Sequence, residues 1–262
     1  MASIGSTARV LAVMEALASA SDDGVVAQTV IEKSGLPGST VYRLLAELEE
    51  AGLIHRTPDR RMHPNFTFER RLSFRHISAA RIVSACRHLS DAVFAASEVI
   101  TFSGHNLWWH LVQQHETQAI RLRAHPGYAR EPYELDSISR LALSFRSLAQ
   151  IEKIWDTTAF FSVGVQRARL SWPQVRNTIE SVDRDGMQFD LQGNAKGVRR
   201  FCIALRDGDR FGCLLTVAEA AIPLRDTTEH VERMRALLTE QRDAIEAAGP
   251  AVPAEMGEAG AA

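Results

Sequence analysis

The segment from residue 27 to residue 54, AQTVIEKSGLPGSTVYRLLAELEEAGLI, places the strongest constraint on the fold. It predicts two short helices joined by a tight turn, GLP. Pro37 suits the first position of the second helix, because its missing N–H would have no helical partner there. Two helices joined by a short turn that contains glycine are typical of the helix-turn-helix motif, whose second helix enters a groove of DNA. We therefore expect a helix-turn-helix near the N-terminus.

The second helix of this motif has one apolar face and one sorted polar face. The apolar residues recur at helical spacing and predict the buried face: Val41, Leu44, Leu45 and Leu48. The polar face begins with hydroxyls, a phenol and an arginine and ends in acids, the reverse of the order that the helix dipole prefers. That order suits a helix whose N-terminal half meets an anion. An ordinary exposed helix face is the alternative, but the preceding turn and the following hairpin favour DNA contact through Ser39, Thr40, Tyr42 and Arg43.

A β-hairpin is expected directly after the second helix, which makes the motif winged. Residues 53–56 and 61–63 form its arms around the turn TPDR. Its basic side chains would reach phosphates or the minor groove: Arg56, Arg60 and Arg61. On the helix, Arg43 can donate two hydrogen bonds to O6 and N7 of a guanine. A core-facing helix over roughly residues 7–20 precedes the motif.

The remainder of the chain alternates short strands with helices and predicts an α+β region. A connecting helix is expected over residues 76–96, followed by the strand segments VITF, LWWHLV, AIRLRA, FCIAL and FGCLLTV. Further helices are expected after Ser171 and after Asp226. Trp108 and Trp109 are adjacent in a strand and so point to opposite faces, one to the core and the other to a pocket or an interface.

Composition narrows the classes of function. A formal net charge of −2 and a pI near 6.5 exclude a wholly basic nucleic-acid coat but allow a local DNA-reading surface. The three cysteines show no metal-ligand spacing, and a reducing cytoplasm is expected. We expect no metal site and no cofactor. The GxSxG, HExxH and Walker patterns do not occur in the sequence, so we expect a protein that is not an enzyme and has no catalytic residues.

The segment GLPGSTVYRLLAELEEAGLI closely resembles the recognition-helix segment of the IclR family of bacterial transcriptional regulators, and RVLAVMEALA resembles the start of that family's winged domain. Three later segments resemble landmarks of its GAF-like effector-binding domain with an antiparallel sheet: ELDSISRLALSF, SVDRDGMQFDLQGNAKGVRRFCIAL and FGCLLTVAEA. The resemblance implies a winged helix-turn-helix domain over 1–72, a linker helix over 73–97 and an effector-binding domain over 98–248. The tail over 249–262 is expected to be disordered.

The resemblance also implies partners: a homodimer or a dimer of dimers on a palindromic operator of double-stranded DNA, and a small-molecule effector. A carboxylate or an aromatic acid is the expected effector, and a catabolic operon the expected target. The implied effector-binding positions, together with the two tryptophans, are Ser137, Ile138, Asp190, Arg200, Thr216, Ala218, Trp108 and Trp109.

Arg200 stands where the family usually has a cysteine, and it has two interpretations. It can bind the effector's carboxylate bidentately, or it can pair internally with Asp190 and fill the cavity. For the whole chain, the alternative function is a winged helix that serves protein contacts, joined to a small-molecule-binding or enzymatic domain.

Overall fold

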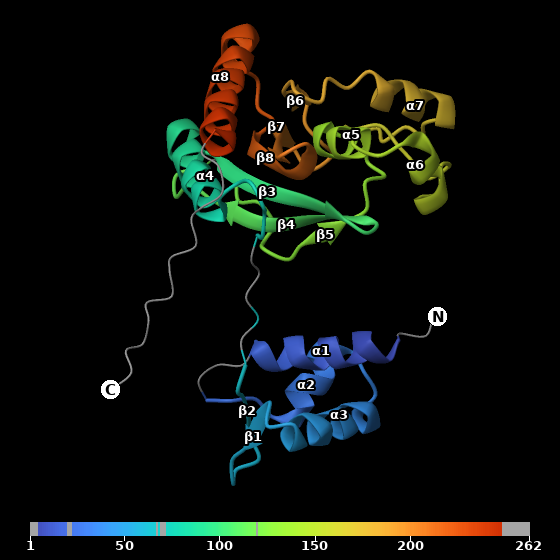
Figure 1. The fold of residues 1–262 in the computed structure, drawn as a ribbon, viewed down its shortest axis with the longest axis vertical. Coiled ribbons are helices and arrows are strands. Elements are labelled where there is room, and N and C mark those ends of the chain that lie inside the picture. The colour runs from blue at the N-terminus through green and yellow to red at the C-terminus, as the bar shows by residue number, and fades with distance from the viewer. Residues whose placement is uncertain (1–4, 20–22, 67, 69–71, 119, 248–262) are drawn as a thin grey trace. The chain divides into compact units, whose positions relative to one another are not determined.

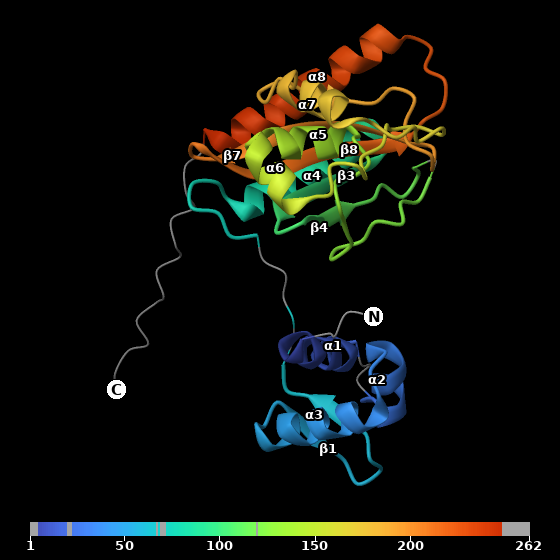
Figure 2. The same cartoon turned by 90° about the vertical axis from the view of Figure 1, so that its right-hand side faces the viewer.

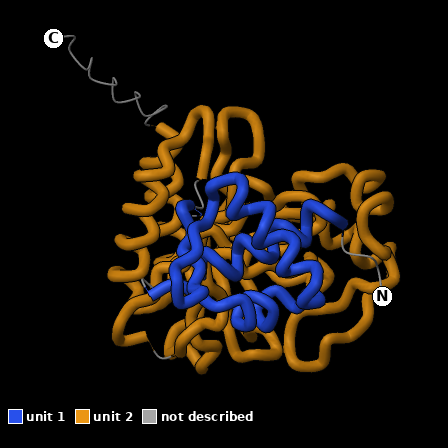
Figure 3. The backbone as a smooth tube through the Cα atoms, turned by 90° about the horizontal axis from the view of Figure 1, so that it is seen from below, with its two compact units in different colours: residues 1–70 blue, residues 71–262 orange. Residues whose placement is uncertain are grey.

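The computed structural model describes residues 5–19, 23–66, 68, 72–118 and 120–247 of the 262-residue chain. Residue 20, at the end of the expected first helix, and the expected disordered tail over 249–262 lie outside the described residues. The chain divides into two compact units, residues 1–70 and 71–262, which Figure 3 shows in different colours. Among the described residues, no helix combines the length and apolar character that crossing a membrane requires.

The first unit is a three-helix domain with a small hairpin (Figure 1). Its elements are α1 (Ser6–Ala18), α2 (Ala27–Ser34), α3 (Gly38–Glu50), β1 (Ile54–Arg56) and β2 (Met62–Pro64). Gly35 adopts a left-handed backbone, with φ of 64°, and ends α2 with a bond from its N–H to the Ile31 carbonyl. All four apolar residues predicted for the buried face of α3 are buried, which confirms the helical period.

The second unit is built on one antiparallel sheet with strand order β5-β4-β3-β8-β7-β6. Its strands are β3 (Ala96–Ser103), β4 (Asn106–Gln113), β5 (Ala129–Arg130), β6 (Gln188–Phe189), β7 (Val198–Asp207) and β8 (Arg210–Ala220). β3 and β8 are central, and each pairs antiparallel with both of its neighbours.

Helices cover the two faces of this sheet (Figures 1 and 2). One face packs against α4 (Ala79–Val93) and α8 (Thr227–Glu246). The other packs against α5 (Ser137–Ser144), α6 (Leu148–Ile154) and α7 (Trp172–Glu180). Alternate residues of one strand supply the two cores, since Phe201 and Ile203 face the first and Cys202 faces the second. The expected α+β fold with an N-terminal helix-turn-helix is confirmed.

Two expected elements differ from the structure. Residues 120–124, within the expected strand AIRLRA, form no strand. Their alternation reflects burial instead, because Leu122 and Ala124 are buried in separate apolar clusters while the outer edge of β4 pairs with β5. The expected connecting helix over 76–96 contains α4, which is shorter and contributes Ile82, Cys86 and Leu89 to the core under the sheet.

Candidate nucleic-acid interface and effector pocket

The N-terminal half of α3 presents the polar side chains that the sequence predicts for DNA contact. Tyr42 is 56% exposed, the Arg43 side chain is 62% exposed, and Ser39 and Thr40 are at least partly exposed. Leu36 is buried just before the helix, and the Pro37 carbonyl accepts hydrogen bonds from the N–H groups of Thr40 and Val41. The turn is therefore anchored to the core while the polar face stays open to a ligand.

The wing is a short, tight hairpin. His55 and His63 pair across β1 and β2, and their rings stack with centroids 5.0 Å apart. At the tip, the Thr57 N–H donates to the Arg61 carbonyl at 2.9 Å. Arg60 has a left-handed backbone, with φ of 64°, at an exposed position in this turn. The turn thus holds a cationic side chain at its outer end.

Three of the four arginines expected to contact DNA pair with acids in the free protein. Arg43 pairs with Glu47 one turn along α3. In the wing, Arg56 lies 3.1 Å from Glu49 and Arg61 lies 3.3 Å from Asp59, so that one ion pair also links the wing to α3. Exposed pairs of this kind contribute roughly 0–1 kcal/mol each. Phosphates or base edges can therefore replace the acids at little cost.

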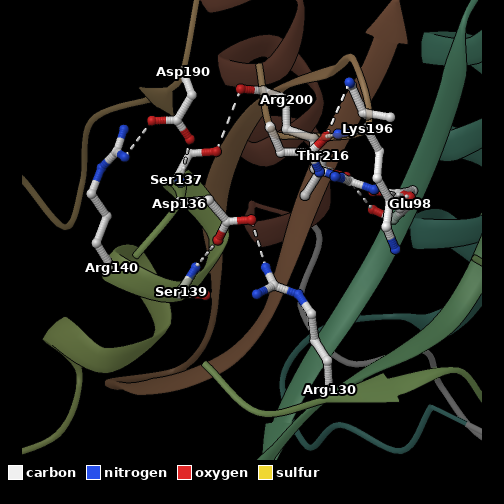
Figure 4. A network of polar contacts seen from close by, with 12 residues as sticks. Glu98, Arg130, Asp136, Ser137, Ser139, Arg140, Asp190, Lys196, Arg200 and Thr216 are labelled. Carbon is white, nitrogen blue, oxygen red and sulfur yellow. Dashed lines mark hydrogen bonds and ion pairs between the residues drawn. The ribbon is translucent and has the colours of Figure 1, made fainter. Parts of the chain in front are cut away.

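In the second unit, Arg200 is held by a fully buried glutamate that the sequence analysis did not single out. Arg200 Nε lies 2.9 Å and Nη2 3.3 Å from the two carboxylate oxygens of Glu98 (Figure 4). The Thr216 hydroxyl donates to the same carboxylate at 3.1 Å. Burial, the largest single effect, acts to lower the pKa of Arg200, but the charge and hydrogen bonds of Glu98 together with the charges of Asp136 and Glu134 outweigh it, and the pKa lies above its ordinary value. The expected internal partner, Asp190, is not the residue that pairs with Arg200.

Asp190 instead joins α5 to the end of β6. Its carboxylate accepts from Arg140 Nη1 at 2.6 Å and from the backbone N–H of Ser137. Arg140 also donates to the Phe189 carbonyl at 2.6 Å. The Ser137 hydroxyl donates to the Arg200 carbonyl at 3.5 Å, which links this group of contacts to β7.

A third buried acid, Asp136, caps the start of α5. Its side chain accepts from the Ser139 N–H at 2.9 Å and from Arg130 Nη2 at 2.6 Å (Figure 4). Burial, the largest single effect, acts to raise the pKa of Asp136, but Arg130, the hydrogen bond from Ser139 and the charge of Arg200 together outweigh it, so the pKa lies below its ordinary value. Burial, followed by the charge of Asp136, raises the pKa of the neighbouring Glu134. The surroundings of Arg200 thus hold three acids, Glu98, Glu134 and Asp136.

The remaining predicted effector positions fall in different surroundings. Ile138 and Trp109 are buried in the core beneath α5, where the Arg130 guanidinium lies 5.7 Å from the Trp109 ring centre. Trp108 is half-buried and alternates with Trp109 along β4. Ala218 pairs in register with Ala96 and with Arg200. The structure therefore joins the four polar predictions, Ser137, Asp190, Arg200 and Thr216, in one network and separates the apolar ones.

Two buried polar atoms beside this network have no hydrogen-bond partner in the described part of the chain. They are Trp109 Nε1 and the Ser139 hydroxyl. Both residues lie near Arg130. Its guanidinium lies over the Trp109 ring and pairs with one oxygen of Asp136, and the other oxygen of Asp136 accepts from the backbone N–H of Ser139. Buried polar groups are normally satisfied, so these two mark a place where a ligand or a water would gain hydrogen bonds.

An apolar cavity of about 250 Å³ opens next to the network. It is lined mainly by apolar side chains together with Gln118, Glu219 and His230, and it reaches Ala218 but neither Arg200 nor Glu98. Next to Arg200 lie polar side chains of the protein itself, Glu98 and Thr216. Among the described residues, no group of three His, Cys, Asp or Glu side chains could hold a metal ion.

The residues that sequence reasoning missed are the partners of those it found: Glu98, Arg130, Asp136 and Arg140. The sequence does contain a signal for Glu98, because a glutamate inside the apolar strand segment ASEVITF needs a partner when it is buried. A signal also exists for Asp136, which precedes a helix at a capping position.

Residues 6–58 match the family model described as the IclR helix-turn-helix domain. A comparison with curated proteins finds no match. Among solved structures, an IclR homologue from Microbacterium hydrocarbonoxydans, complexed with 4-hydroxybenzoate, is 17% identical with a TM-score of 0.65 over 92% of this chain and 97% of that one. A regulator from Alicyclobacillus acidocaldarius is 12% identical, with a TM-score of 0.66 over 94% and 98%. The Thermotoga maritima IclR is 16% identical, with a TM-score of 0.61 over 91% and 96%. At these identities the structures establish a shared fold, while the family model identifies the N-terminal domain.

Proposed function

We propose, from the premise that this chain carries an IclR helix-turn-helix domain on the fold of that family's transcriptional regulators, that it is a ligand-responsive, sequence-specific DNA-binding regulator. The observation that carries this proposal is the exposed polar half of α3, set between an anchored turn and a basic wing inside the residues that match the family model. The structural neighbours named above are transcriptional regulators or homologues of one, and we propose no catalytic activity.

The mode of DNA binding follows from this surface. We place α3 in the major groove, with Arg43 released from Glu47 to bond a guanine and with the hydroxyls of Ser39 and Thr40 on phosphate or base edges. The wing arginines then contact the backbone or the minor groove. A homodimer or a dimer of dimers would present two such helices to a palindromic operator, with half-sites about one helical turn apart.

The domain arrangement proposed is a winged domain over 1–72, a connecting segment over 73–97 and an effector-binding domain over 98–248, acting in the cytoplasm. A catabolic operon is the target that we propose for this regulation.

For the effector we propose a small organic acid bound near Arg200. An arginine fork recognises a carboxylate bidentately. The neighbour from Microbacterium hydrocarbonoxydans was solved with 4-hydroxybenzoate, an acid of this kind. The unsatisfied Trp109 Nε1 and Ser139 hydroxyl offer hydrogen bonds to a polar group elsewhere on such a molecule.

The test compares operator binding of wild type, Arg43→Ala and Arg176→Ala by fluorescence anisotropy, with DNA from upstream of the protein's own reading frame and with random DNA, over a salt series. Arg176 is a matched control, since it is an exposed arginine that pairs with a glutamate four residues on, in the other unit. We expect Arg43→Ala to weaken operator binding by about 1–3 kcal/mol and Arg176→Ala to leave it unchanged. The proposal would be contradicted if wild type and Arg43→Ala had the same affinity for the operator and neither bound it more tightly than random DNA.

A further inference from the structure

Glu98 is an unusual residue for the middle of an antiparallel sheet. It lies on β3, is fully buried, and takes up the Nε and Nη2 edge of Arg200 with both carboxylate oxygens. The Arg200 side chain is itself only 12% exposed. This edge is one of the two through which an arginine binds a carboxylate with two parallel hydrogen bonds. The protein's own carboxylate therefore occupies one of the positions in which Arg200 can bind an acid ligand.

We propose that Glu98 is the specificity-determining residue of the effector pocket: an acid effector displaces Glu98 from Arg200, and the displaced carboxylate takes up one proton from solvent. This inference rests on the proposed effector site at Arg200. It predicts that acid binding is linked to pH through a residue that need not touch the effector.

The charge count around Arg200 explains why a proton must enter. Arg200 is surrounded by three acids, Glu98, Glu134 and Asp136, while Arg130 is already committed to Asp136. Arg167 also acts on Glu134, so an incoming carboxylate brings the count to four negative charges against the three guanidinium groups of Arg200, Arg130 and Arg167. Keeping a buried carboxylate charged without its partner is costly, and protonation removes that cost.

Glu98 is the acid that loses its partner in this exchange, so the proton goes to its carboxylate. The groups that bond to it are Arg200 on β7 and the Thr216 hydroxyl on β8, and its charge also acts on the Cys86 thiol of α4. Burial raises the pKa of Cys86 to about 12, so this thiol stays neutral. Figure 4 also shows Lys196, whose side chain is exposed. The Thr216 hydroxyl donates to Glu98 now and can accept from it once Glu98 is protonated.

The experiment measures heat and proton uptake when 4-hydroxybenzoate binds the full-length protein. Isothermal titration in two buffers of different ionisation enthalpy, at several pH values from 6 upward, gives the number of protons taken up. For wild type we expect uptake of about one proton and an affinity that falls about tenfold per pH unit. For Glu98→Gln we expect tighter binding, no uptake and no pH dependence. Glu134→Gln is the matched control and should keep the proton uptake of wild type.

If wild type binds too weakly for calorimetry, thermal-shift assays measure instead how much 4-hydroxybenzoate and benzoate stabilise the variants. Glu98→Gln should then be stabilised by the acids, and Glu98→Gln/Arg200→Gln should not be. Circular dichroism verifies that the variants fold. If Glu98→Gln does not fold, the proton uptake of wild type, measured at raised acid concentration, decides alone.

Acid binding to wild type without proton uptake would overturn the proposal, because the effector would then bind beside Glu98 and not in its place. Failure of Glu98→Gln to gain acid-dependent stability would overturn it as well. Operator binding without acid is measured on the same preparations. Its loss would contradict the proposed regulator function while leaving the proton count intact, so the two failures are distinguishable.

Discussion

At the scale of single residues, the second unit depends on buried ion pairs whose members cannot be removed one at a time. The Arg130–Asp136 and Arg140–Asp190 pairs join α5 to other parts of the unit, and each side chain is less than a fifth exposed. A buried pair contributes little net stability, because desolvation offsets the attraction, but a single remaining charge is strongly unfavourable.

Arg130→Met should therefore destabilise the protein by about 3–5 kcal/mol, measured by urea unfolding at pH 7. The double variant Arg130→Met/Asp136→Asn should recover much of that loss. Because Arg130 lowers the pKa of Asp136, the stability from this pair is complete above the ordinary value of 3.8 and is lost as the pH falls below it. The difference between wild type and Arg130→Met should shrink over the same acid range. A small destabilisation of Arg130→Met that is independent of pH would count against this account.

The sequence predicted polar members of the pocket but not their partners, and the reason is register. Glu98 meets Thr216, and Arg200 lies opposite Ala218, only because β3 and β7 both pair with β8 at those positions. Glu98 and Arg200 are 102 residues apart along the chain, and no local sequence pattern specifies which acid pairs with which arginine. Pairing of Asp190 with Arg200 was one of the two interpretations that the sequence left open, and the structure pairs Asp190 with Arg140 instead.

At the scale of elements, local signals predicted the helices well. The apolar period of α3, the turn before it and the Asp226 cap of α8 each depend on residues within a few positions. The expected strand over 119–124 was wrong over its described residues, because alternating apolar residues indicate alternating burial and not a pairing partner.

The order of charges along α3 gives an element-scale prediction. Glu47 holds Arg43 in an exposed pair one turn along the helix, which contributes about 0.3–0.5 kcal/mol. Glu47→Gln should free Arg43 and tighten operator binding about twofold in anisotropy at low salt. Glu180→Gln, which frees Arg176 in the other unit, should have no effect. Weaker binding of Glu47→Gln would mean that Glu47 positions Arg43 for DNA and does not compete with it.

At the scale of the whole molecule, the two compact units allow DNA and effector to be bound by different parts of one chain. If the effector changes operator affinity by some factor, operator DNA must change effector affinity by the same factor.

We expect 4-hydroxybenzoate to change the operator Kd by about 5- to 150-fold, the usual range of coupling energies. Titrating the acid with and without operator should give the same ratio. Two unequal ratios would show that a further equilibrium, such as assembly of subunits, is linked to binding.

The acids that pair with the DNA-facing arginines also set how the protein responds to ionic strength. In the proposed complex a guanine takes Arg43 and phosphates take Arg56 and Arg61, so the carboxylates of Glu47, Glu49 and Asp59 are left to gather cations from solution. Part of the cation release that drives DNA binding is then cancelled, so the affinity falls less steeply with salt than the number of contacted phosphates alone would require. A DNA-binding protein built in this way loses less of its operator affinity as the salt content of the cell rises.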